Sequence, residues 1–151
     1  MSLETDIEVL RTVQLFDELS VEQLRLLAFG SEHRHLRGGE TLFRAEARAD
    51  AGFVVVSGEV ELVSGSGDRR RVVARLGPGS ILGELALLTG TRRAATAVTA
   101  TDCDLIRITR QSFRRMLEAY PDVAAGLYQR MRAELADMTA QIGSIAPRFE
   151  D

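Results

Sequence analysis

The sequence predicts a mainly β domain with flanking helices (α+β), in which a β-roll or jelly-roll-like barrel lies between N-terminal helices and a long C-terminal helix. Apolar residues recur every three or four positions near both ends of the chain, which is the period of an amphipathic helix. Between these ends, short runs alternate apolar and polar residues, and glycine-containing turns separate the runs, as in all-β barrels and rolls. No helix long enough to connect parallel strands interrupts the runs, which argues against a parallel sheet.

The chain of 151 residues suits a single domain with one proper core. Within that domain we expect an N-terminal helical segment, a β-roll, C-terminal helices and a tail. These cover residues 1–30, 31–109, 110–145 and 146–151.

The N-terminal segment contains a signal for the start of a helix. Ile7, Leu10 and Val13 lie near helical spacing. Ser20-Val21-Glu22-Gln23 then has the pattern of a capping box, in which the Ser and Gln side chains bind each other's free backbone amides. We expect a helix to begin there and to continue to Phe29.

The middle of the chain carries seven candidate strands. Turn signals separate them at Arg37-Gly38-Gly39, Ser57-Gly58 and Gly77-Pro78-Gly79, and Ser64–Asp68 is typical of a hairpin turn. The predicted strands are Glu32–Leu36, Thr41–Arg44, Gly52–Val56, Glu59–Ser64, Arg71–Leu76, Ala94–Thr99 and Cys103–Ile108.

The C-terminal region returns to helical spacing. Gln111–Ala119 is a short amphipathic segment that ends at Tyr120-Pro121. A helix of about 20 residues, roughly 30 Å long, is expected to follow. A small roll does not cover so long an apolar stripe, so we expect part of it to pair with a second copy as a homodimer. The stripe consists of Val123, Leu127, Met131, Leu135, Met138 and Ile142.

Charge and composition disfavour several classes of function. The formal net charge is −3, whereas a domain that grips a nucleic-acid backbone normally carries a basic excess. No apolar run approaches the roughly 20 residues that span a bilayer, and no secretory pattern opens the chain. The one cysteine, Cys103, cannot form an internal disulfide, which fits a cytoplasmic location.

Residues 82–98 form the most informative stretch. Gly83 lets the backbone approach another group closely, and Glu84–Leu88 suits one helical turn whose leading amides point at an anion. Gly90 permits a tight return, and Arg93 then heads a β-like segment. A guanidinium and a carboxylate placed in this way can bind the anion and the hydroxyl of one polar ligand. The alternative is an ordinary corner in which the two charges pair on the surface.

This stretch resembles the phosphate-binding cassette of the cyclic-nucleotide-binding domain family, which includes bacterial catabolite activator proteins and the regulatory subunits of cAMP-dependent protein kinase. Gly83–Leu87 matches the family's Gly-Glu-Leu-Ala, and Thr91–Thr96 matches its Arg followed by small residues. The interval from Glu to Arg equals that of the kinase subunits. Leu36–Phe43 and Phe53–Val60 also resemble an early strand pair and a β-turn of the family, and the likeness covers about 10–142.

The resemblance implies a role for each cassette residue. Arg93 is expected to clamp the exocyclic phosphate oxygens of the cyclic nucleotide, and Glu84 to accept the ribose 2′-hydroxyl. Backbone amides are expected to complete the cradle, and they lie around Gly83, Leu85, Ala86, Ala94 and Ala95.

The resemblance also bears on the base. Family members that prefer cGMP tend to have Thr after the Arg, where this chain has Ala94, so cAMP is the expected ligand and cGMP the alternative. Matching the C-terminal helix to the catabolite-activator branch puts Met138 and Thr139 at the adenine, and Tyr128 is a second candidate for stacking. For each of these three, helix packing or a solvated surface is the alternative.

The chain departs from the family pattern at three positions. Arg92 replaces the usual Pro, Glu46 occupies a position that is commonly Gly, and Leu82 replaces Phe. None of these removes a ligand group, so the site is expected to bind.

Together these features predict a cyclic-nucleotide sensor that acts through its C-terminal helices, not an enzyme, with no cofactor and no metal. One alternative is a degenerate, non-binding dimerisation scaffold of a transcription regulator or membrane protein. A remote one is a cupin-type metalloenzyme, for which His33 and His35 leave too few ligands. The chain is expected to be a stand-alone module, a sensor fragment, or the terminal part of a transporter or channel, and its output partner stays open.

Overall fold

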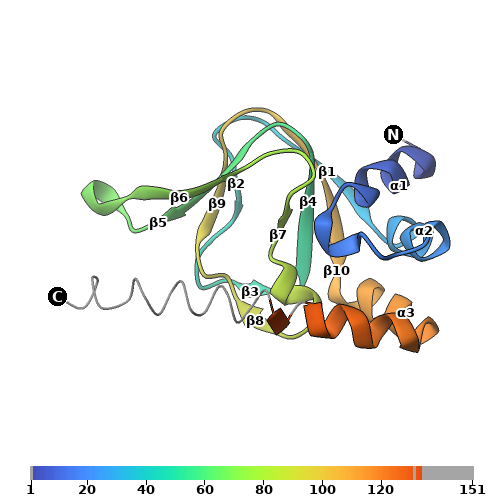
Figure 1. Ribbon diagram of the computed structural model, residues 1–151. Coiled ribbons are helices and arrows are strands. Elements are labelled where there is room, and N and C mark those ends of the chain that lie inside the picture. Colours follow the sequence, from blue (N-terminus) through green and yellow to red (C-terminus); the bar gives the residue numbers. More distant parts are fainter. Residues whose placement is uncertain (1, 131, 134–151) are drawn as a thin grey trace.

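The computed structural model describes residues 2–130 and 132–133. Its antiparallel strands form an open roll, and the helices gather at one end of that roll (Figure 1). One sheet has the order β1-β10-β4-β7, with strands Glu32–Leu36, Cys103–Thr109, Ala51–Ser57 and Ile81–Leu82. The second has the order β2-β9-β5-β6, with strands Thr41–Phe43, Thr96–Thr99, Val60–Ser64 and Arg71–Leu76. A separate two-stranded ladder joins β3 (Arg48–Ala49) to β8 (Thr91–Arg92).

The predicted fold class is confirmed, with the correction that the described strands form open sheets and close no barrel. Each predicted strand is present with ends shifted by at most two residues. The largest shift concerns β9, which begins at Thr96 because Ala94 and Ala95 form a bend. The strands β3, β7 and β8 were not predicted, since two residues are too few to show a period of two.

Among the described residues, four α-helical segments and the 3-10 helix η1 lie at one end of the roll, and the 3-10 helix η2 (Gly67–Arg69) lies in the β5–β6 hairpin. The predicted capping box is confirmed, because Ser20 Oγ accepts from the Gln23 amide at 3.2 Å and Gln23 Oε1 accepts from the Ser20 amide at 2.7 Å. Residues 121–130 are also helical. The other bounds are α1 Leu3–Arg11, η1 Gln14–Phe16, α2 Val21–Phe29 and α3 Arg110–Ala119.

Strand β10 separates two hydrophobic clusters. Ile106 and Ile108 face the helices, where Phe16 and Phe113 lie with their ring centroids 6.4 Å apart. Leu105 faces the inside of the roll, in a cluster that also includes Phe53, Val55, Val60, Leu82, Ala97 and Cys103. Alternate side chains of β10 therefore pack against the helices and against the inside of the roll, so that this one strand contributes to both clusters.

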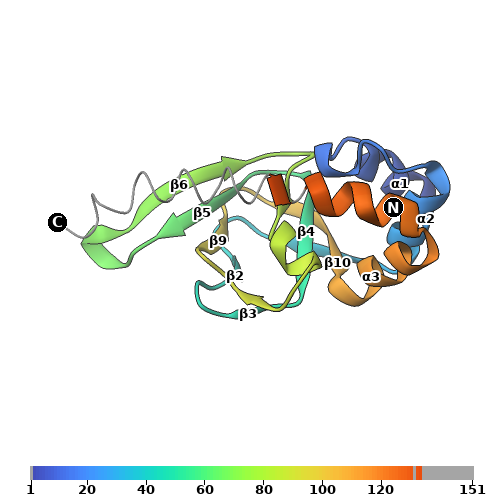
Figure 2. The same ribbon diagram turned by 60° about the horizontal axis from the view of Figure 1, so that its bottom comes forward.

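Figure 1 and Figure 2 show the β5–β6 hairpin projecting from the end of the roll that lies away from the helices. Among the described residues, no helix combines the length and the apolar character needed to span a membrane.

Candidate functional site

The stretch 82–98 folds as a turn around a single glycine. Gly83 follows β7 and has a φ of +76°, a left-handed conformation that favours glycine. The 3-10 helix η3 then spans Glu84–Leu87, and the Ala86 amide donates to the Gly83 carbonyl at 3.0 Å. The single helical turn predicted from the sequence is therefore present, in the tighter 3-10 form.

This turn forms one wall of a cavity of about 350 Å³. The volume lies near the lower end of the range of small-molecule sites, which is roughly 300–1,000 Å³. The structure brings together all the cassette residues that the sequence singled out: Gly83, Glu84, Leu85, Ala86, Arg93, Ala94 and Ala95.

Arg93 is the polar centre of the cavity wall, although only 7% of it is exposed. Its Nη2 donates to the Ala51 carbonyl at 2.7 Å, and its Cζ lies 4.2 Å from the ring centroid of Phe43 and 5.7 Å from that of Phe53. Among the residues that the structure describes, its Nε and Nη1 have no hydrogen-bond partner. A buried guanidinium is thus held by one carbonyl and two aromatic faces, with two donors left for a ligand. The surface corner weighed as an alternative does not describe a side chain buried in this way.

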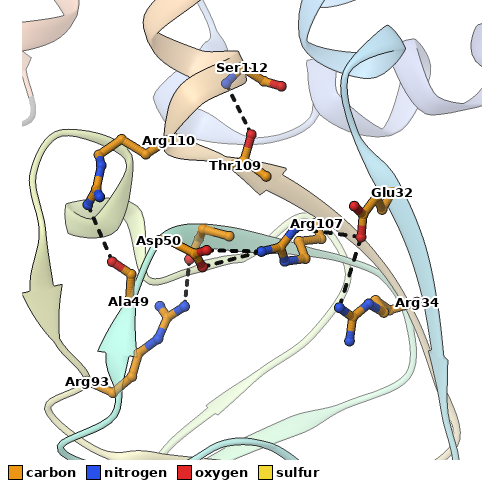
Figure 3. A network of polar contacts seen from close by, with 10 residues as sticks. Glu32, Arg34, Ala49, Asp50, Arg93, Arg107, Thr109, Arg110 and Ser112 are labelled. Atoms are coloured by element: carbon orange, nitrogen blue, oxygen red, sulfur yellow. Dashed lines mark hydrogen bonds and ion pairs between the residues drawn. The ribbon is translucent and has the colours of Figure 1, made fainter.

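The charged groups of the described residues leave Arg93 without a direct counterion. Burial lowers the pKa of Arg93 below its ordinary value. The negative charge of Asp50 raises this pKa, and the positive charge of Arg107 lowers it further. Figure 3 shows that Asp50 forms an ion pair with Arg107, whose Nη2 lies 3.3 Å from Asp50 Oδ1. Within residues 2–130 and 132–133, Arg93 forms no ion pair. An anion in the cavity would supply the missing charge and accept from the unused donors.

Gly83 is needed for a steric reason as well as for its φ. A Cβ placed on Gly83 would collide with Arg93 Nη1. The guanidinium therefore occupies the space that any other residue's side chain would enter, and the glycine and the arginine form one structural unit.

Two departures from the family pattern contact each other. Glu46 has a φ of +70°, the only positive φ of a described residue other than glycine, which explains why relatives commonly have Gly there. The Glu46 amide donates to the Arg93 carbonyl at 2.8 Å, and Arg92 Nη1 donates to the Glu46 carbonyl at 2.9 Å. The arginine that replaces the usual Pro thus holds the strained residue in place.

We expect Glu46→Gly to raise the free energy of unfolding by about 0.5–1 kcal/mol, because it removes a left-handed conformation that is costly for residues with a Cβ. Ala47→Gly is the matched control, because Ala47 has no positive φ and the added freedom should lower stability there. Urea denaturation of both variants checks this. Equal destabilisation by both would contradict the strain at Glu46.

The cavity also has apolar walls that the motif did not identify. Phe43, Leu62, Leu76 and Ile81 line it from β2, β5, β6 and β7. In β2, β5 and β6 the period of two carries the signal, since it places Phe43, Leu62 and Leu76 on the inner face of the roll. The two-residue β7 has no such period and gives no signal for Ile81. The motif alone says nothing of them, because they are distant in sequence.

The proposed base contacts lie elsewhere or outside the described residues. Tyr128 is 44% exposed on the helix of residues 121–130 and does not line the cavity. Met138 and Thr139 lie outside the described residues, as does the rest of the predicted long helix beyond residue 133.

Each of the two histidines forms a hydrogen bond with a different carboxylate. His33 Nε2 lies 2.8 Å from Asp6 Oδ2 of α1, and His35 Nδ1 lies 2.8 Å from Asp104 Oδ1 of β10. In the part of the chain that the structure describes, no group of three or more His, Cys, Asp or Glu residues could hold a metal ion.

Comparison with known proteins agrees with this geometry. The family model described as "cyclic nucleotide-binding domain" matches residues 33–120. The cAMP-dependent protein kinase regulatory subunit of Eremothecium gossypii is 36% identical over 103 residues, which is 68% of this chain and 22% of that subunit. The chain thus spans about a fifth of the length of this relative.

Solved structures give the same result. A cyclic nucleotide-binding-like protein of Brucella abortus is 45% identical with a TM-score of 0.68, over 75% of this chain and 97% of that one. The regulatory domain of Toxoplasma gondii PKA, crystallised with cAMP, is 30% identical with a TM-score of 0.70, over 76% of this chain and 44% of that one. This chain therefore belongs to the cyclic nucleotide-binding domain family.

Proposed function

We propose that the chain is a regulatory module that binds a cyclic nucleotide, cAMP in preference to cGMP, in the cavity behind residues 82–98. The observation that carries the proposal is Arg93, a buried cation in the cavity wall whose Nε and Nη1 have no hydrogen-bond partner among the described residues. A cyclic nucleotide carries the negative charge that Arg93 lacks, the chain belongs to the cyclic nucleotide-binding domain family, and the Toxoplasma relative was crystallised with cAMP.

Each part of the ligand has a counterpart in the cavity. The exocyclic phosphate oxygens accept from Arg93, and the amides of the η3 turn complete the cradle. Glu84 lines the cavity and is half-buried, which suits acceptance of the ribose 2′-hydroxyl. The apolar wall formed by Leu62, Leu76 and Ile81 is suited to cover the base.

Calorimetric titration with cAMP, cGMP and 2′-deoxy-cAMP tests the proposal. We expect cAMP to bind with a micromolar or lower Kd. The deoxy analogue should bind at least about 10-fold more weakly, since it leaves the Glu84 carboxylate without that hydroxyl. A folded, ligand-free chain that gives no heat with cAMP or with cGMP would overturn the proposal and favour the alternative of a non-binding dimerisation scaffold.

The residue after Arg93 provides a test of the base preference. We expect Ala94→Thr to raise the affinity for cGMP by about 10-fold, because one added hydroxyl can form one hydrogen bond with the guanine amino group. Ala94→Val is the matched control, since it has the same shape without the hydroxyl. An equal change in cGMP affinity in both variants would show that volume, not hydrogen bonding, is responsible.

The position of Leu87 supports the proposal that ligand binding changes the packing of the C-terminal helices. The residues of η3 that precede it line the cavity, whereas Leu87 is buried in the cluster that contains Phe113 of α3 and Leu127. Arg130, on the same helix as Leu127, donates from Nη2 to the Gln14 carbonyl at 3.0 Å. A shift of the η3 turn on binding would therefore change packing among α3, the helix of residues 121–130 and the N-terminal segment.

Hydrogen exchange tests this transmission. We expect cAMP to change the exchange rates of amides in residues 121–130, which lie outside the cavity lining. A variant without the Arg93 guanidinium, treated with the same cAMP concentration, is the control. Changes confined to the cavity residues would contradict transmission through Leu87.

We further propose that the C-terminal helix pairs two copies of the chain, which sedimentation equilibrium with and without cAMP would test.

A further inference from the structure

A second hollow lies beside the cavity, and arginine is its dominant residue. It has a volume of about 600 Å³ and is lined by Arg48 of β3, Arg92 of β8 and Arg110, the first residue of α3. The short ladder between β3 and β8 brings the first two together, because Arg48 is the register partner of Arg92. We call it the arginine hollow.

The positive charge of the arginine hollow is largely uncompensated. Within residues 2–130 and 132–133, none of these arginines forms an ion pair. Arg92 and Arg110 each donate to a backbone carbonyl, at 2.9 Å to Glu46 and at 3.4 Å to Ala49. Asp50, the one acidic residue among the described residues of the lining, already forms an ion pair with Arg107 (Figure 3). Most guanidinium donors around the hollow therefore remain available.

The start of α3 adds to this positive potential. The N-terminal end of a helix carries a partial positive charge that acidic side chains normally offset. The first turn of α3 contains no acidic residue, and Arg110 stands at its first position. The chain thus places a cation where it would ordinarily place an anion, which favours an anion from outside.

The remaining lining decides the chemical class of that anion. Apart from the charged residues, the described lining of the hollow consists of Ala49, Gly90 and Thr91, and these offer neither an aromatic ring nor a large aliphatic side chain to a base. A ligand is therefore recognised by its charge, which sets this hollow apart from the apolar cavity beside it. Guanidinium groups from three separate elements suit a ligand with several phosphate oxygens better than a single carboxylate.

We propose that the arginine hollow is a second anion site, which binds an oligophosphate group and not a cyclic nucleotide. The group is either a free inorganic oligophosphate or the phosphate moiety of a nucleoside diphosphate. This site does not depend on the proposed function, since Arg48 and Arg110 do not line the cavity of Arg93.

Calorimetric titration of the full chain with inorganic pyrophosphate tests the proposal. Wild type should bind saturably, and the double variant Arg48→Gln/Arg110→Gln should bind at least about 10-fold more weakly. The matched control is Arg69→Gln/Arg70→Gln, which removes the same charge from an exposed cluster on the β5–β6 hairpin and should change the affinity by less than about twofold. Circular dichroism confirms that each variant is folded.

Arg93→Ala separates the two sites, because pyrophosphate could also enter the cavity. We expect this variant to retain pyrophosphate binding. Absence of saturable binding, loss of binding only in Arg93→Ala, or equal loss in the hairpin control would each overturn the proposal. A parallel titration with ADP identifies the source of the group: equal affinity indicates a free oligophosphate, and tighter binding of ADP indicates a nucleoside diphosphate.

Discussion

Arg93→Met is expected to weaken cAMP binding by at least about 100-fold while changing the free energy of unfolding of the ligand-free protein by less than about 1 kcal/mol. Loss of two charge-assisted hydrogen bonds to a phosphate, at about 1.5–3 kcal/mol each, accounts for the effect on binding. Stability changes little because opposing contributions balance. The variant loses the bond to the Ala51 carbonyl and the contact with Phe43, but it also removes a buried charge that has no counterion in the described part of the chain.

Calorimetry and urea denaturation of the same preparation measure the two quantities. Arg114→Met is the matched control, since it removes an equal charge from an exposed position on α3 and should alter neither. If Arg93→Met lost binding only because the protein unfolded, the arginine would be a structural residue. If it kept its affinity for cAMP, the proposed site would be wrong.

Gly83→Ala is expected to destabilise the protein by roughly 2 kcal/mol or more and to weaken cAMP binding by at least about 10-fold. A left-handed φ costs a residue with a Cβ about 1 kcal/mol, and displacement of the Arg93 guanidinium adds to that cost. Because the same guanidinium is proposed to bind the phosphate, the strain also lowers the affinity.

Gly39→Ala separates the two contributions. Gly39 has a φ of +85°, and a Cβ there would meet no atom within 4 Å. It should therefore show only the conformational cost of about 1 kcal/mol, with unchanged cAMP affinity. Thermal denaturation and calorimetry of both variants provide the comparison. Equal effects of the two substitutions would show that the contact between Gly83 and Arg93 does not matter.

The parts of the fold that depend on local patterns could be predicted from the sequence. The capping box at Ser20 is a contact between residues close in sequence, and the alternation in Cys103–Ile108 reflects the two faces of one strand. The cassette residues could also be named, because the thirteen positions from Gly83 to Ala95 form a compact motif. Their convergence on one cavity follows from the turn that this motif makes.

Features that depend on distant contacts could not be predicted. The burial of Arg93 is set by Phe43 and Phe53, which come from two other strands. The arginine hollow arises because two-residue strands pair across 43 intervening residues, from Arg48 to Arg92. Such short ladders have no period of their own, and tertiary contacts alone determine where they form.

The central claim is that the unused donors of Arg93 bind the cyclic phosphate, and the side-chain Nε–H resonance of Arg93 in a ¹H–¹⁵N spectrum tests it most directly. In the free protein this group has no hydrogen-bond partner within residues 2–130 and 132–133, so the resonance should lie near that of an unbonded guanidinium. On addition of cAMP we expect a downfield shift and slower exchange with water, both absent with adenosine. Saturation with cAMP that shifts other resonances but leaves the Arg93 Nε–H unchanged would contradict the claim.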